Sequence, residues 1–377
     1  MNGGGCPIRK YTRNHNPFSR WLGEEGLEKA RSGSVTSPIN NSHVYSAVRA
    51  SNSDGFEASK IPDECSVVHL NLVARHGTRA PTRKRIKELD ELAIKLEALL
   101  SDARHEAQGN VESLQRIPGW LWGWKSPWKG RLKGGELISK GEDELYDLGI
   151  RVRDRFPELF SAEYHPDIYT ITATQVPRAS ANAVAFGMGL FSGRGSLGPG
   201  KHCAFSVISE SCASDICLRF FDRCQIYKEF RKNQEPAVDK LKEPVLHEVS
   251  SALVARFKLN FTKQDTASLW FLCKQVSLLE WTDDLEGFIL KGYGKAVNYR
   301  MGVPLLQDVV ESIEQAIIAN EGNTIQWKLE IMSVALLKAR LRFAHAETVV
   351  PFSCLLGLFL HGSGGFESES EKALTLV

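Results

Sequence analysis

The stretch "NLVARHGTRAPTRKR", residues 71–85, begins as an apolar segment and ends as a basic one. Together with the preceding residues it forms the short apolar run "SVVHLNLVA", residues 66–74, which is typical of a buried strand in a parallel or mixed sheet. Five cations and one histidine then gather between residues 75 and 85, although the formal net charge of the whole chain is only +2. The pattern predicts a local anion site at the end of a strand.

The bulk composition limits the classes of function. A chain of 377 residues with 42% hydrophobic and 24% charged residues is compatible with one large or two medium globular domains. Its near-neutral charge argues against a nucleic-acid partner, which usually requires a strongly basic surface. No apolar run reaches the roughly 18 residues that span a bilayer, and residues 1–21 lack the apolar segment of a secretory signal peptide. We expect no nucleic acid and no membrane span.

The heptad "RHGTRAP", residues 75–81, contains the chemistry of a phosphate site. The planar guanidinium groups of Arg75 and Arg79 match phosphate oxygens in bidentate fashion, and Gly77 can let the backbone approach a bound anion. Nearby positive charge keeps the His76 imidazole neutral, so that a ring nitrogen can attack phosphorus. The alternative is an ordinary histidine in a basic loop. Five specified residues in seven arise by chance about once in ten thousand chains of this length.

Other segments predict an α/β fold of three layers, with mostly helical segments inserted between its strands. A second strand is expected over residues 167–174, ahead of Arg178, and a third over "LRFAHAET", residues 341–348. The carboxyl ends of such strands meet at one edge of a sheet, so His76, Arg178, His345 and Glu347 can converge there. Apolar periodicity predicts helices after Pro81 and over residues 141–156, 236–258, 304–320 and 325–340.

Eight cysteines are present, and no two of them form a CxxC pair. We therefore expect no metal site and leave disulfides and free thiols as alternatives. The Gly-, Ser- and Asn-rich residues 1–60 are expected to be poorly ordered.

These motifs together resemble the histidine acid phosphatases, a branch of the histidine phosphatase superfamily. The resemblance implies that His76 is the nucleophile and that Arg75 and Arg79 bind the transferred phosphate. It also implies that Arg178, in "TQVPRASANAVAF", and His345, in "RFAHAET", complete the phosphate pocket, and that Thr82 contacts the substrate. Most members carry His-Asp where this chain has His-Ala-Glu, and "HAETVVPF" resembles the multiple inositol polyphosphate phosphatase subfamily, including its plant members.

From this resemblance we expect a metal-independent, cofactor-free phosphohydrolase that removes phosphate from inositol polyphosphates through a phosphohistidine. Glu347 is the expected proton donor, with a pKa raised by the negative charge of the substrate. Arg83 is expected to bind a phosphate that is not being cleaved. The resemblance further implies a monomer in a secreted or endomembrane compartment.

The family fold implies a single unit over residues 61–377, after the N-terminal segment. We assign residues 61–82, 135–210 and 325–377 to the α/β core, and residues 83–134 and 211–324 to the helical cap. Only 30 residues follow Glu347, so we expect a chain shortened at this end. The alternatives are a broad-specificity acid phosphatase, a bisphosphoglycerate phosphatase, or an inositol-phosphate-binding protein without turnover.

Overall fold

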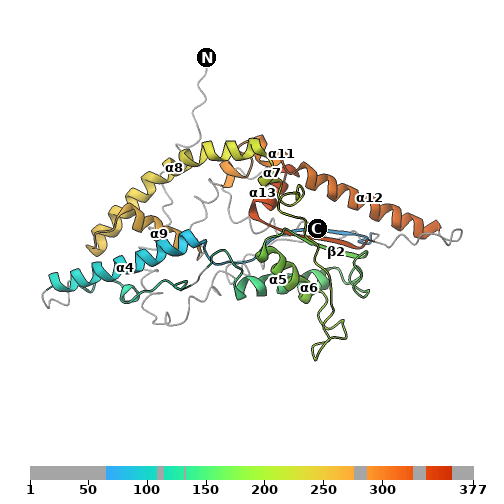
Figure 1. Ribbon diagram of the computed structural model, residues 1–377, viewed down its shortest axis with the longest axis horizontal. Helices are drawn as coiled ribbons and strands as arrows, with labels where there is room; N and C mark the ends of the chain where they lie inside the picture. The colour runs from blue at the N-terminus through green and yellow to red at the C-terminus, as the bar shows by residue number, and fades with distance from the viewer. Residues whose placement is uncertain (1–64, 108–113, 131–132, 276–286, 326–336, 359–377) are drawn as a thin grey trace, which may run out of the picture. The chain divides into compact units, whose positions relative to one another are not determined.

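The computed structural model describes residues 65–107, 114–130, 133–275, 287–325 and 337–358 (Figure 1). The expected poorly ordered segment, residues 1–60, lies outside the described residues. The chain divides into two compact units. Unit 1 comprises Met1–Phe56, Arg83–Leu132 and Lys240–Glu280, and unit 2 comprises Glu57–Thr82, Lys133–Asp239 and Trp281–Val377. The assignment of residues to core and cap stays a prediction.

Unit 2 is built on three parallel strands in the order β1-β3-β2, namely β1 (Leu70–Arg75), β3 (Ala339–Ala344) and β2 (Tyr169–Ala173). Arg75 pairs with Ala344, and Phe343 lies opposite both Ala74 and Ala173, so the three strands end at one edge. The strands predicted near residues 66–74 and 167–174 are confirmed as β1 and β2.

The third predicted strand is displaced. Its prediction over residues 341–348 is wrong beyond Ala344, because a helix, α13 (Ala346–Leu355), begins two residues later. The helix predicted over residues 325–340 is wrong for Ala339 and Arg340, which belong to β3, and residues 326–336 lie outside the described residues. Hydrogen bonding to strands on both sides outweighs the helical periodicity of this segment.

Two helices, α5 (Ser139–Arg155) and α6 (Pro177–Leu190), cover one face of the sheet (Figure 1). Their apolar side chains form one core with the strand residues Leu72, Ile171 and Phe343. The predicted stripe of α5 is confirmed, since Leu145, Leu148, Val152 and Phe156 are all buried. A side chain at Gly149 would collide with the backbone of α6, so a glycine lets the two helices pack closely.

The opposite face of the sheet is covered by α12 (Val303–Ile325) and α13 (Figure 1). Three shorter segments join this core: α7 (Phe220–Arg223), α11 (Ala296–Arg300) and the first part of α8 (Gln225–Phe257). The buried Arg342 of β3 reaches α12, where its Nε donates to Asp308 Oδ2 at 2.7 Å. Its Nη1 donates to Asn71 Oδ1 of β1 at 2.7 Å. Helices on both faces of a parallel sheet confirm the three-layer α/β prediction.

The described part of unit 1 is helical, with α4 (Arg83–Glu106), the 3₁₀ helix η3 (Gly119–Leu121), the second part of α8 and α9 (Lys263–Gln275). The predicted apolar face of α4 is confirmed by its buried residues Ile86, Leu89, Leu92, Leu96 and Leu100. Four tryptophans of the loop around η3 pack against the same core. Helix α9 was not predicted, because its periodicity is interrupted by polar residues.

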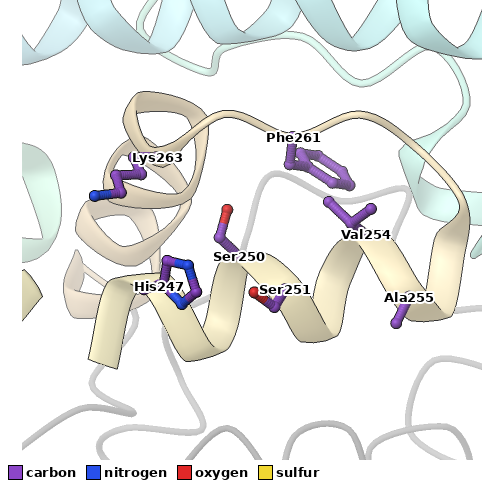
Figure 2. Close-up of a pocket in the computed structure, with 7 residues that line it drawn as sticks. All are labelled: His247, Ser250, Ser251, Val254, Ala255, Phe261 and Lys263. Carbon is purple, nitrogen blue, oxygen red and sulfur yellow. The ribbon is translucent and has the colours of Figure 1, made fainter. Parts of the chain in front are cut away.

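A hollow of about 380 Å³ lies between α8 and the start of α9 in unit 1 (Figure 2). Figure 2 shows Ser250 and Val254 of α8 facing Phe261 across it, with His247 and Lys263 at one end. None of the predicted site residues lines it. Within the ranges that the structure describes, no helix has the length and apolar character to cross a bilayer. The cysteines whose side chains are described there are free thiols, namely Cys65, Cys203, Cys212, Cys217, Cys224 and Cys354.

Candidate active site

The ends of the three strands bring two histidines together in unit 2. His76 follows β1, and its backbone N–H donates to Ala344 O of β3 at 3.0 Å. His345 follows β3, and Thr174, which follows β2, donates its N–H to Phe343 O at 3.1 Å. The rings of His76 and His345 lie edge to face with their centroids 5.4 Å apart. The predicted convergence at the carboxyl edge of the sheet is therefore present for these residues.

The His76 ring is held in one tautomer. Its Nδ1 lies 2.9 Å from Gly77 O; because a carbonyl oxygen only accepts, Nδ1 carries the proton and Nε2 keeps a free lone pair. The pKa of His76 is lowered to about 3, mainly by burial; the Gly77 hydrogen bond opposes this shift in part, and the positive charges of Arg75 and Arg178 add smaller lowering effects. The ring is neutral, as predicted, but burial contributes more than the guanidinium groups.

The backbone after His76 is fixed by α5 and α6. Gly77 N donates to Asn182 Oδ1 of α6 at 2.6 Å, and Thr78 N donates to Glu144 Oε2 of α5 at 2.7 Å. A Cβ on Gly77 would lie 2.5 Å from Gly141 O. In the structure its missing side chain allows the close approach of the α5 backbone; the expectation that this glycine also admits a bound anion stays a prediction.

The segment "GELISKG", residues 135–141, lies beside the motif loop. Ala80 N donates to Glu136 O at 2.8 Å, and Gly135 N donates to Pro81 O at 2.9 Å. Arg79 forms an isolated antiparallel bridge with Leu137. This pairing fixes the backbone on which Arg79 stands.

Three arginines form a group with the histidines: Arg75 and Arg178 act electrostatically on both rings, and Arg79 acts on Arg178. Arg75 ends β1, Arg79 follows in the motif loop, and Arg178 lies in the first turn of α6. Burial lowers the pKa of Arg79 and of Arg178, and the arginines reinforce this effect on one another. Among the described residues, no ion pair joins any of the three to a carboxylate. The group is therefore a concentration of positive charge that makes no direct ion pair within the described residues, although the Glu347 carboxylate is near enough to interact with it electrostatically.

His345 joins this group through both ring nitrogens. Arg178 Nη2 donates to its Nδ1 at 3.3 Å, so Nε2 carries the proton and donates to Thr174 Oγ1 at 2.9 Å. Burial lowers the pKa of His345 to about 4, with Arg178 as the next contributor. His345 is thus neutral and orients the guanidinium group of Arg178.

Glu347 lies in the first turn of α13, not on a strand. Its Oε1 forms an ion pair with Lys291 Nζ at 2.9 Å. Burial alone would raise the pKa of the Glu347 carboxyl, but the Lys291 ammonium, assisted by Arg75, lowers it well below its usual range. We expected a raised pKa from substrate charge; the charges of the protein itself act in the opposite direction.

The remaining predicted residues are not joined to this group. Thr82 is exposed, and no interaction links it to the other site residues within the part of the chain that the structure describes. Arg83 is exposed and begins α4 in unit 1. The roles of both stay predictions.

Sequence reasoning missed Lys291, Asn182 and Glu144. Asn182 carried a usable signal, because it is the one amide in the small-residue, mostly apolar run of α6. Lys291 stands in a turn far from any recognised motif, and no local pattern distinguishes it from other lysines.

Comparison with known proteins agrees with this geometry. Residues 66–279 and 274–366 match the histidine phosphatase superfamily (branch 2). The chain is 28% identical over 322 residues to multiple inositol polyphosphate phosphatase 1 of Homo sapiens, covering 78% of this chain and 63% of that protein. It is 26% identical over 381 residues to the Dictyostelium discoideum protein of the same name, covering 83% and 57%. The chain thus spans less than two thirds of the length of these relatives.

A solved structure shows the same fold. The multiple inositol polyphosphate phosphatase of Bifidobacterium longum, in complex with inositol hexasulfate, superposes with a TM-score of 0.50 at 16% identity, covering 80% of this chain and 78% of that one. The sequence match extends over most of the chain, and the motif residues stand where the parallel strands end. The chain belongs to branch 2 of the histidine phosphatase superfamily.

Proposed function

We propose that this protein is a phosphohydrolase that removes phosphate from inositol polyphosphates through a phosphohistidine. The observation that carries the proposal is the surroundings of His76: a neutral ring with a free Nε2 lone pair, beside three guanidinium groups without ion-pair partners among the described residues. Such a site attracts a dianionic phosphoryl group and presents a nucleophile to it. The names of the curated relatives support inositol polyphosphates as the substrate class.

In the first step His76 Nε2 attacks phosphorus, an N–P bond forms, and the P–O bond to the inositol ring breaks. Arg75, Arg79 and Arg178 neutralise the equatorial oxygens, where the charge of the transition state lies. The leaving alkoxide needs a proton, and Glu347 is the carboxyl group of this site that can supply it.

In the second step water hydrolyses the phosphohistidine. The Glu347 carboxylate, having given up its proton, accepts one from the attacking water, and an O–P bond replaces the N–P bond. Inorganic phosphate leaves, and His76 returns to its neutral form. Proton donor and acceptor are then the same carboxyl group, and no metal takes part in either step.

The test is phosphate release from inositol hexakisphosphate at about pH 5, with and without a chelator. We expect release that the chelator does not reduce, together with an acid-labile phosphoprotein that can be trapped by rapid quenching. Glycerol 2-phosphate serves as the monophosphate comparison and separates this function from that of a broad acid phosphatase. Binding of inositol hexakisphosphate without phosphate release would overturn the proposal in favour of a binding protein.

A further inference from the structure

The ion pair between Glu347 and Lys291 conflicts with the role of Glu347 as a proton donor. A general acid must hold its proton when the bond breaks, but a carboxylate 2.9 Å from an ammonium group is ionised. The pair must therefore separate before Glu347 can act. Both side chains retain about a quarter of their exposure, 22% for Lys291 and 25% for Glu347, so an incoming ligand can reach them.

We propose that Lys291 is a displaceable partner of Glu347: an anionic group of the substrate other than the one being cleaved takes over its ammonium, and Glu347 then binds the proton that it donates. This inference rests on the proposed function, since it explains how Glu347 acquires the proton that it donates. Lys291 is a positioning residue that acts through Glu347.

The charges around Glu347 favour this exchange. Apart from Lys291, the groups that interact electrostatically with it come from β1, the motif loop, α6, the strand end after β3, and α8; they are Arg75, Arg79, Arg178, His345, Tyr227 and Arg231. Bound anions compensate the arginines and supply negative charge beside the carboxyl. With Lys291 removed, burial then favours the protonated form.

The mechanism distinguishes substrates by the number of their anionic groups. A substrate with a second phosphate near the reacting one displaces Lys291 from Glu347. The Glu347 carboxylate then binds a proton. A monophosphate binds to the arginines but leaves the ion pair between Lys291 and Glu347 intact. Its poor leaving group then has no proton donor. Preference for polyphosphates would then arise in the chemical step as well as in binding.

Proton uptake on ligand binding tests the inference without turnover. The probe is inositol hexasulfate, whose sulfate groups do not titrate near pH 5, measured by calorimetry in two buffers of different ionisation enthalpy. We expect the unmodified protein to take up about one proton more than Glu347→Gln does. Subtracting the variant removes any uptake by His76 and His345. Inorganic sulfate, with one anionic group, should produce no such difference. Equal uptake in the two proteins with inositol hexasulfate would overturn the inference.

The Lys291→Gln variant provides a second readout. The Glu347 carboxyl then loses its largest stabilising charge, so a greater share of it is protonated before the ligand arrives and the extra uptake becomes smaller. The kcat/KM for inositol monophosphate should rise about tenfold, and its pH profile should extend to higher pH. Lys295→Gln, the same charge change at an exposed residue of the same segment, should alter neither. If Lys291→Gln only raises KM for hexakisphosphate and leaves proton uptake unchanged, Lys291 is an anion contact and the inference is wrong.

The two proposals fail in different experiments. Absence of phosphate release from inositol hexakisphosphate would reject the hydrolase, whereas the proton uptake measured with inositol hexasulfate decides the displacement of Lys291 independently.

Discussion

Asn182 holds the backbone of Gly77 in place: its Oδ1 accepts the Gly77 N–H at 2.6 Å. The same amide donates from Nδ2 to Gly141 O at 2.8 Å, and the side chain has no exposed surface. One residue of α6 thereby connects the motif loop to the start of α5, and so fixes the loop that carries His76 and Arg79.

Replacing this residue should affect both stability and activity. Asn182→Ala removes the acceptor of the Gly77 N–H and a donor to the Gly141 carbonyl, both held by a fully buried side chain, so we expect the free energy of unfolding to fall by about 2–4 kcal/mol. Urea denaturation and kcat should both reveal the change. Ser180→Ala removes a single 3.4 Å hydrogen bond from the same helix and should stay within about 0.5 kcal/mol. Equal effects of the two substitutions would contradict the connecting role of Asn182.

A side chain at Gly77 should destabilise the motif loop. The Cβ of Gly77→Ala would lie 2.5 Å from Gly141 O and 2.8 Å from Gly141 Cα, both backbone atoms that cannot rotate away. We expect a loss of about 1–3 kcal/mol in thermal or urea unfolding. Gly119→Ala is the matched control, because a Cβ added there would meet nothing within 4 Å.

Substitutions of His76 and of Glu347 should slow turnover to different extents. His76→Ala removes the nucleophile, so phosphate release should fall by about 10⁴-fold or more. Glu347→Gln keeps the nucleophile and the arginines, and should slow release by about 10²–10⁴-fold while inositol hexakisphosphate still binds. Initial rates and equilibrium dialysis measure the two properties. Full activity of Glu347→Gln would remove its role as donor.

The two buried histidines should make stability depend on pH. Their pKa values in the folded protein, about 3 for His76 and about 4 for His345, lie below the ordinary 6.5. As the pH falls below 6.5 the unfolded chain binds protons that the folded chain does not, so stability decreases towards pH 3. Above pH 6.5 the two histidines have no further effect. The slope of unfolding free energy against pH should be smaller in His76→Gln/His345→Gln, and an unchanged slope would contradict this assignment.

The same low pKa values should also appear in the kinetics. Because His76 stays neutral down to about pH 3, the nucleophile remains available in weakly acidic solution. The acid limb of the kcat/KM profile for inositol hexakisphosphate should therefore lie well below pH 6.5. An acid limb near 6.5 would place an ordinary, solvated histidine at the reacting position.

The ion pair between the buried Arg342 of β3 and the half-buried Asp308 of α12 should be important for stability. Asp308→Asn leaves the guanidinium group of Arg342, which is 3% exposed, without its counter-charge, and should lower the free energy of unfolding by about 3 kcal/mol. Asp154→Asn removes an exposed pair with Arg153 and should change it by less than about 1 kcal/mol. Chemical denaturation of the two variants measures both changes in the free energy of unfolding.

Much of the fold could be predicted from local patterns. The stripes of α4 and α5 and the alternation of β2 follow from apolar spacing, and the site residues 75–79 form one continuous motif. The prediction failed at the end of β3, where the same residues suit a strand or a helix and the neighbouring strands decide the outcome. It also failed for α9, whose polar residues find partners within unit 1, as when Lys95 pairs with Asp265.

The residue types and their spacing along the chain were enough to predict the α/β class and to propose His76 as the nucleophile and Arg75 and Arg79 as phosphate-binding groups. The protonation state of Glu347 depended on the fold, because Lys291 lies 56 positions earlier in the sequence and only packing brings its ammonium within 2.9 Å. The same holds for Asn182 beneath Gly77, which lies 105 positions away. Electrostatic and hydrogen-bond energies depend on distance in space, and sequence spacing does not determine that distance for residues so far apart.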